Sequence, residues 1–345
     1  MTVNCGLDLH RQQITFDWVD SESGECAGGR IAPANRESFR AWLAKFEGRQ
    51  VEVVVEGCTG WRFVAEECRR AGFKVHVADP GEASTIGRSH KKRAKTDRVD
   101  ARHLRGLLEA GKVPESWLPP PQALEARALV RLYRDLVQER SRWQQRIHAT
   151  LFHHGALAQR KLLLGDRSLL HSSPALSPAG REAIEAALAV IDALDAQVAR
   201  VHAQLVRFAA KQPGCKELQR EYGIGGLYAV IIWAELGDTA RFSSSDDAVR
   251  HTGLDISVYS SDGKRTRGRL TRQGPPLLRW ALYEAARHAA RTGSPDHEYY
   301  LRVAARVGAQ LATLSVARKI TRRCHHRLRA LGEQAFAELP DQIAA

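Results

Sequence analysis

The sequence has few of the features that mark membrane-spanning, disulfide-rich or zinc-binding proteins. Its six cysteines are scattered over 345 residues and form no CxxC pair, so we expect reduced thiols rather than a disulfide framework or a zinc site. The longest apolar run, 227–236, contains Glu235 and falls short of the ~20 residues of a membrane span. No basic segment precedes an apolar one at the start, so we expect no signal peptide, no membrane partner and a cytoplasmic location.

The charge balance is strongly basic. Lys and Arg number 52 against 39 Asp and Glu, which gives a formal net charge of +13. A protein this basic usually binds a polyanion, most often nucleic acid, although a basic surface without that role is an alternative. Hydrophobic residues are 43% and charged residues 26%, which is typical of a folded globular protein and excludes wholesale disorder. The length indicates two or three domains.

The first hundred residues alternate between strand-like and helix-like segments, as in an α/β domain with a central sheet. We place this domain at 1–115, because the prolines 119–121 interrupt the pattern. Apolar and β-branched runs predict strands, and apolar residues at steps of three or four predict helices. The expected strands are 5–10, 13–19, 24–32, 51–55 and 73–78, and the expected helices are 36–46 and 61–71.

The rest of the chain is predicted to be helical. Two segments of 116–212 have apolar stripes, and the second keeps a heptad-like seam from Ile184 to Phe208. They predict an antiparallel helical hairpin or coiled-coil arm, and two helices of one bundle fit the same pattern. We expect a mainly helical C-terminal domain at 213–345, with helices at 227–236, 247–252, 277–291 and 298–329 and a polar, basic loop at 257–273.

Four carboxylates of the first domain are candidates for a metal site. Asp8 lies in the first strand and Glu56 ends the fourth, in apolar surroundings where a carboxylate is costly without a partner. Asp97 and Asp100 are three residues apart, so on a helix they share a face. Clustered carboxylates repel one another unless a cation lies between them, and Mg²⁺ prefers such oxygen ligands. Structural ion pairs are the alternative interpretation.

A second candidate is the stretch from Tyr259 to Arg269, in which two serines precede a glycine and four cations. Cations neutralise the phosphates of a nucleic-acid backbone, and glycines allow close approach. A serine here could act as a nucleophile, but the spacing alone fits a plain phosphate-binding loop better. The residues concerned are Ser260, Ser261, Lys264, Arg265, Arg267 and Arg269.

Two further segments are candidate nucleic-acid contacts. Gly223 and Gly225 precede an apolar helix, as in a helix-hairpin-helix turn, whose backbone N–H groups hold a phosphate. A tight glycine turn between packed helices is the alternative. The basic segment 86–105 offers further cations to phosphates, among them Lys91, Lys92, Arg93 and Lys95.

The order of these motifs resembles a known family. The first domain reads Gly-Leu-Asp8-Leu-His, then Val-Val-Glu56-Gly-Cys-Thr-Gly-Trp, then Lys-Thr-Asp97-Arg-Val-Asp100-Ala. The last region reads Tyr-Gly223-Ile-Gly225-Gly and Tyr-Ser-Ser261-Asp-Gly-Lys-Arg, followed by Gly268-Arg269-Leu-Thr-Arg-Gln-Gly274. Together they resemble the DEDD transposases of bacterial insertion sequences, the bridge-RNA-guided recombinases of the insertion-sequence one-ten family. The similarity covers nearly the whole chain and is weakest in the helical arm.

The resemblance implies an RNase H-like (RuvC-like) first domain whose four carboxylates bind Mg²⁺, and a C-terminal domain that supplies a serine nucleophile. Aligned on Gly263-Lys264, Ser261 takes the nucleophile position; Asp262 stands where glycine is usual, so Ser260 is the alternative. The resemblance also implies donor and target DNA as substrates, a structured guide (bridge) RNA as partner, and a bacterial host. The helical arm would assemble homo-dimers or homo-tetramers.

Three other functions fit parts of the pattern. A RuvC-like, metal-dependent junction nuclease would cut with water and need no serine link. A non-catalytic nucleic-acid-binding protein would not need an intact set of four acids. An actin-like ATPase shares an Asp-bearing first strand, but it would have glycine-rich phosphate loops after its strands, and the sequence has none of that form.

Overall fold

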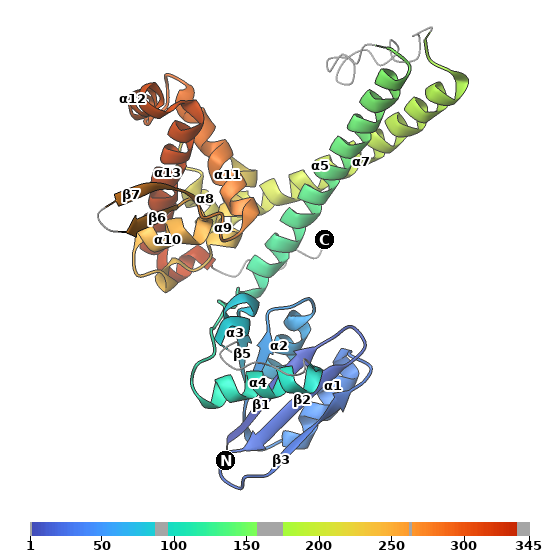
Figure 1. Cartoon of the computed structure of the whole chain (residues 1–345), viewed down its shortest axis with the longest axis vertical. Helices are drawn as coiled ribbons and strands as arrows, with labels where there is room; N and C mark the ends of the chain where they lie inside the picture. The colour runs from blue at the N-terminus through green and yellow to red at the C-terminus, as the bar shows by residue number, and fades with distance from the viewer. Residues whose placement is uncertain (1, 87–95, 157–174, 262–263, 337–345) are drawn as a thin grey trace. The chain divides into compact units, whose positions relative to one another are not determined.

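A computed structural model describes residues 2–86, 96–156, 175–261 and 264–336, with the backbone alone for 258–261 and 264–267. The chain forms two compact units, Met1–Leu118 and Pro119–Ala345 (Figure 1). The division of the second unit into an arm and a C-terminal domain stays a prediction. Of the expected nucleic-acid contacts, Lys91, Lys92, Arg93 and Lys95 lie outside the described residues. No helix of the described ranges is both long and apolar enough to cross a bilayer.

The first unit is built on a mixed five-stranded sheet with the order β3-β2-β1-β4-β5. The first three strands are antiparallel, and β4 and β5 continue the sheet parallel to β1. All five strands were predicted from the sequence, within a few residues at each end. They are β1 (Thr2–Leu9), β2 (Ile14–Asp20), β3 (Cys26–Ile31), β4 (Gln50–Glu56) and β5 (Lys74–Ala78).

Strand alternation sends one set of side chains to a core beneath α1 (Arg36–Leu43) and α2 (Trp61–Arg70). Asn35 begins α1 by accepting a hydrogen bond from the Ser38 N–H, and a 3₁₀ turn, Ala44–Phe46, follows it. This core holds α1 and α2 against the sheet. Its buried members include Val3, Cys5, Leu7, Ile14, Phe39, Trp42, Val53, Val55, Val64 and Cys68.

The opposite face of the sheet is covered by α4 (Asp97–Glu109), with α3 (Pro80–Ile86) beside it. The helix lies so close to β1 that a Cβ built on Gly6 would be 2.1 Å from the Ala101 carbonyl oxygen. A glycine is therefore required there. The buried Asp17 carboxylate on β2 accepts hydrogen bonds from Arg105 Nε at 2.6 Å and Arg102 Nε at 3.4 Å, which tie α4 to the sheet.

The second unit begins with two long antiparallel helices, α5 (Pro121–His153) and α7 (Pro178–Lys211), which lie side by side (Figure 1). Arg140 Nη1 donates to Asp195 Oδ1 at 2.9 Å near the middle of the pair. Ile147, close to the end of α5, shares a buried cluster with Ile184, close to the start of α7. The predicted helical hairpin is therefore present, whereas a coiled-coil character stays a prediction.

A second core is centred on α9 (Gly226–Leu236), whose apolar residues are buried, and residues of α5 and α7 and of the helices that follow pack around it. Trp233 is fully buried there and donates from its indole N–H to the Ala335 carbonyl at 2.7 Å. The 3₁₀ turns are Thr239–Arg241, His288–Ala290 and Gly332–Phe336. The helices are α8 (Pro213–Leu218), α9 (Gly226–Leu236), α10 (Ser245–Thr252), α11 (Pro276–Arg287), α12 (His297–Val307) and α13 (Ala309–Leu331).

Two expectations for this unit were wrong. The polar stretch 257–273 is largely not a loop, because β6 (Ile256–Ser261) and β7 (Lys264–Leu270) pair as an antiparallel hairpin. The Asp-Gly dipeptide between two alternating segments is a hairpin signal that outweighs the high charge. The helix expected at 298–329 is divided into α12 and α13, because Gly308 adopts φ +89°, which ends a right-handed helix.

Candidate active site

Asp8 and Glu56 lie at the carboxyl ends of two adjacent parallel strands. The register of β1 and β4 pairs Leu7 with Val55, so the next residue on each strand is one of the two acids. Side chains two apart along a strand share a face, which puts Asp8 on the same face as Gly6, beneath α4. The sheet therefore presents two carboxylates side by side toward the helix.

The first turn of α4 contributes Asp97 and Asp100. Thr96 begins the helix by accepting a hydrogen bond from the Val99 N–H at 3.4 Å, which makes Asp97 the first helical residue. An acid in the first turn of a helix is favoured by the helix dipole. The close approach at Gly6 and the bonds to Asp17 hold this turn against the strands.

His10 lies between the acids of the two elements. Its Nε2 atom is 3.1 Å from Asp8 Oδ2 and 3.4 Å from Asp97 Oδ1, and Asp97 also accepts a hydrogen bond from Gln13 Nε2 at 3.2 Å. Potential ligand atoms of Asp8, His10 and Asp97 all lie within 4.8 Å of one another. Glu56 and Asp100 do not belong to this group of three. Sequence reasoning missed His10, although it ends the Gly-Leu-Asp-Leu-His motif.

The electrostatics of the cluster favour a cation. Burial raises the pKa of Asp8; His10 opposes the rise, and the charges of Asp97 and Asp100 add to it. The neighbouring Cys58 thiol also has a raised pKa, through burial and through the charges of Glu56 and Asp8. A partly buried carboxylate close to other acids is the kind of oxygen-rich site that divalent cations occupy. The described residues thus fit a divalent metal, with an imidazole as an additional neighbour.

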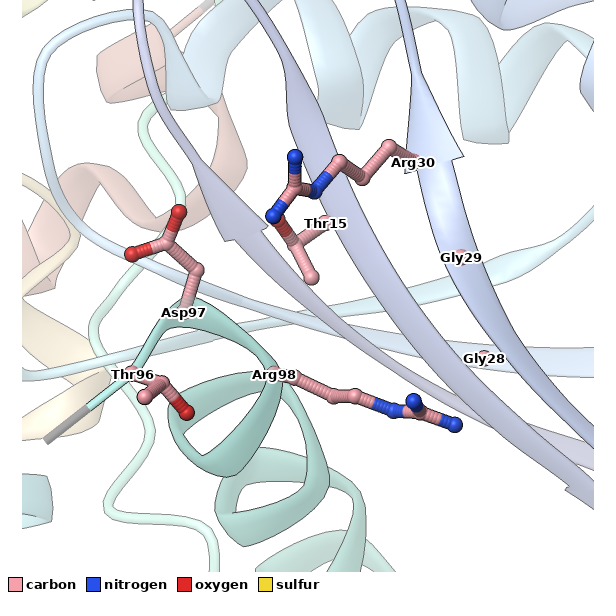
Figure 2. A pocket seen from close by; sticks show the side chains of 7 residues that line it. All are labelled: Thr15, Gly28, Gly29, Arg30, Thr96, Asp97 and Arg98. Carbon is pink, nitrogen blue, oxygen red and sulfur yellow. The ribbon is translucent and has the colours of Figure 1, made fainter. Parts of the chain in front are cut away.

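A pocket of about 430 Å³ adjoins the acids on the side of β2 and β3 (Figure 2). The Arg30 side chain extends from β3 over Thr15, and the Arg98 side chain extends from the first turn of α4 toward Gly28. Asp97 forms the border between this pocket and the acidic cluster. Two cations therefore lie beside the carboxylates. The lining residues are Thr15, Gly28, Gly29, Arg30, Thr96, Asp97 and Arg98.

In the second unit, the expected serines lie in the β6–β7 hairpin. The backbone register pairs Ser261 with Lys264 and Ser260 with Arg265, so both serines are next to a cationic residue in the ladder. The hairpin is compact at its base, where a Cβ on Gly268 would lie 1.3 Å from the Ser257 carbonyl oxygen. The Arg269 N–H donates to Ser257 Oγ at 3.1 Å. Arg267 lies on β7 and pairs with Val258 of β6.

Gly223 and Gly225 have different structural roles. Gly223 has φ +88°, and a Cβ there would be 2.5 Å from the Ala285 carbonyl oxygen, so this glycine allows tight packing against α11. Gly225 is the N-cap of α9 and has open space around it. Both line a cavity of about 660 Å³ together with Tyr228, His288 and Arg291, among others. The open position of Gly225 and the cations nearby suit a phosphate at the start of α9.

The comparisons agree on one family. A family model of IS110-type DEDD transposases, described as "Transposase", matches residues 5–154, and one described as "Transposase IS116/IS110/IS902 family" matches residues 215–301. A "Probable family 20 transposase" of Pseudomonas aeruginosa is 24% identical over 294 residues, covering 83% of each chain. The "Transposase for insertion sequence element IS1328" of Yersinia enterocolitica is 26% identical over 239 residues, covering 68% of this chain and 70% of that one.

Proposed function

The chain belongs to the IS110 family of transposases, which cut and rejoin DNA, and from this we propose that its first unit is an RNase H-like catalytic domain that acts with Mg²⁺. The proposed Mg²⁺ ligands are the acids of β1, β4 and α4. When bound, the metal would offset charge on the reacting phosphate and activate an oxygen. The ligands proposed are Asp8, Glu56, Asp97 and Asp100.

The observation that carries the proposal is the convergence of Asp8 and Asp97. They are 89 positions apart in the sequence, yet one carboxylate oxygen of each and a ring nitrogen of His10 all lie within 4.8 Å of one another. The strand order β3-β2-β1-β4-β5, with an acid at the end of each of the two central parallel strands, supports an RNase H-like assignment. Structural ion pairs do not require two or more carboxylates to adjoin one another.

We propose that the second unit supplies the nucleophile, Ser261, with Ser260 as the alternative. The serine oxygen attacks phosphorus, the bond from phosphorus to the 3′ oxygen breaks, and the serine proton leaves as the 3′ oxygen gains one. The products are a phosphoserine link and a free 3′-hydroxyl, so rejoining requires no external energy source. The cationic residues of the hairpin would neutralise the adjoining phosphates. They are Lys264, Arg265, Arg267 and Arg269.

The remaining partners are also proposals. A net charge of +13 supports binding to a large amount of phosphate, which suits donor DNA, target DNA and a structured guide RNA together. We propose that Gly225 contributes a phosphate contact at the start of α9, with Gly223 holding the turn in shape. The paired helices α5 and α7 supply a long surface for homo-dimer or homo-tetramer assembly in the bacterial cytoplasm.

The metal-dependent part is tested by DNA cleavage with purified full-length protein, its guide RNA and DNA that contains the insertion-sequence ends. Separate Asp8→Asn and Asp97→Asn variants are expected to lower the cleavage rate by about 10³-fold or more, because each removes a metal-ligand charge. Glu37→Gln, on the opposite face of the sheet, is the control and should cut normally. Full cleavage by Asp8→Asn in Mg²⁺ would refute the metal-site proposal.

A further inference from the structure

We propose that the pocket lined by Thr15, Arg30 and Arg98 binds a non-scissile phosphate of the same DNA strand that the carboxylates act on. We call it the phosphate pocket. The inference rests on the proposed function, since it takes the acids to be the site of cleavage. It adds a residue set that holds the strand in place without reacting with it.

The sheet register puts the phosphate pocket in line with the acids. Asp8 pairs with Thr15 across β1 and β2, and Thr15 pairs with Arg30 across β2 and β3. Directly paired residues share a face of the sheet, so the three form a row of acid, hydroxyl and cation. Adjacent strands are ~4.8 Å apart, which puts Arg30 ~10 Å from Asp8 along that row. Phosphates of one strand rise ~3.4 Å each, so the pocket phosphate lies one to three positions from the cut.

The two pocket arginines are available for an anion. Arg30 and Arg98 are both exposed, and no carboxylate among the described residues forms an ion pair with either of them. Arg102 and Arg105, further along the same helix, are instead engaged by Asp17. On α4, Arg102 and Arg105 therefore tie the helix to the sheet, whereas Arg98 faces the pocket.

Thr15 provides the second, independent observation. Its side chain is buried, at 3% exposure, and within the described residues its Oγ1 has no hydrogen-bond partner. A buried hydroxyl without a partner is destabilising, so it needs an explanation. The Arg30 side chain extends over Thr15 (Figure 2), so movement of Arg30 onto a phosphate would uncover the hydroxyl. The phosphate would then supply the missing acceptor.

The surroundings also suit a phosphodiester. A Cβ on Gly28 would lie 3.3 Å from Asp17 Oδ2 and 3.4 Å from Arg98 Nε, so the backbone of β3 closely approaches the Arg98 side chain at this position. The first turn of the 13-residue α4 helix, whose N-cap is Thr96, turns the positive end of its dipole toward the pocket. We assign the occupant as DNA rather than RNA or free phosphate, because the pocket shares Asp97 with the acids proposed to act on DNA.

Binding without cleavage tests this assignment. The complex of the full-length protein with its guide RNA, with Ca²⁺ in place of Mg²⁺, is titrated with DNA duplexes. In each duplex a single phosphate is replaced by a neutral methylphosphonate, and a parallel series places the replacement in the guide RNA. In the wild type, one replacement within three positions of the cut should weaken binding about tenfold, the usual effect of losing a charge-assisted contact. In the Arg30→Gln/Arg98→Gln variant, that replacement should change the affinity less than twofold.

Two other variants make the result specific. Arg69→Gln removes an exposed arginine from α2, on the opposite face, and should keep the wild-type interference pattern. Thr15→Val removes the unpartnered hydroxyl, so it should raise the Tm of the free protein by about 2–4 °C while reducing the interference. A merely structural threonine would lower the Tm and leave the interference unchanged.

Other outcomes would overturn the assignment. If the double variant shows the same interference pattern as the wild type, the phosphate pocket does not hold this phosphate. Interference only from methylphosphonates in the guide RNA would assign the pocket to RNA. Stabilisation by inorganic phosphate alone, lost in the double variant and without position-specific interference, would assign it to a free anion. None of these results affects the outcome of the Asp8→Asn cleavage test. The phosphate-pocket proposal can therefore be refuted while the metal-site proposal stands, and the reverse also holds.

Discussion

Gly6 on β1 and Ala101 on α4 meet backbone to backbone, and a Cβ on Gly6 would lie 2.1 Å from the Ala101 carbonyl oxygen. This contact sets the distance between the strand that contains Asp8 and the helix that contains Asp97 and Asp100. The geometry of the candidate metal site therefore depends on a residue that has no side chain.

Gly6→Ala is expected to push α4 away from the sheet. The added methyl group meets backbone atoms that cannot rotate aside, so we expect a loss of about 2–3 kcal/mol of stability and at least a tenfold loss of cleavage. Gly106→Ala is the matched control, because Gly106 lies on α4 with nothing within 4 Å of its Cβ position. That change should stabilise the helix by about 0.5–1 kcal/mol. Urea unfolding and a cleavage assay measure both effects.

Asp17→Asn tests whether the sheet holds α4 through charge. Asp17 is buried and accepts hydrogen bonds from Arg105 and Arg102, so its neutralisation removes the buried negative charge that both arginines face. We expect a loss of about 3 kcal/mol in the free energy of unfolding. Glu109→Gln removes the more exposed partner of Arg105 and should cost less than about 0.5 kcal/mol. Equal effects of the two changes would contradict this account.

Metal binding should be detectable without DNA. Mg²⁺ or Mn²⁺ is expected to raise the Tm of the wild type, because a ligand that binds only the folded state stabilises it. Asp8→Asn should abolish the shift, and His10→Ala should reduce it, since His10 lies 3.1 Å from Asp8 and 3.4 Å from Asp97. An undiminished shift in Asp8→Asn would show that the metal binds elsewhere.

The first unit should lose stability in acid through Glu67. A hydrogen bond from Arg40 lowers the pKa of Glu67 most; burial opposes this effect, and a hydrogen bond from Arg36 adds to it. The pKa falls from its ordinary value of 4.5 to about 2. Because the folded state binds its proton more weakly, the stabilisation is complete above pH 4.5 and declines as the pH falls toward 2. Glu67→Gln should lower stability at neutral pH and flatten this acid dependence. Glu37→Gln should alter neither in urea titrations across that range.

Much of the first unit follows from the sequence, because its strands are short, β-branched and separated by clear turns. Asp8 and Glu56 were identifiable as acids in apolar strands, and Asp97 and Asp100 as a helical pair. Local patterns do not give the distance between elements, so the approach of His10 to Asp97 depends on packing that no spacing reveals. The same holds for Asp17, which reads as an ordinary polar position in an alternating strand.

The second unit was harder to predict. The charge of 257–273 concealed a β-hairpin, since pairing between β6 and β7 depends on backbone bonds that charged residues also form. A single glycine, Gly308, divides a segment whose apolar pattern continues across the break.

Thr15 in the first unit shows a further limit of the sequence, because only the three-dimensional structure reveals that a hydroxyl is buried without a partner among the described residues.

The central claim is that the acids of the first unit and a serine of the second act on one DNA bond. It is tested most directly by trapping the protein on nicked DNA in Mg²⁺ and locating the attached nucleotide by mass spectrometry. We predict a 5′-phosphate on Ser261, with the adduct lost in Ser261→Ala and in Asp8→Asn. Cleavage at the wild-type rate without any adduct, or an adduct that persists in the Ser260→Ala/Ser261→Ala protein, would contradict the account.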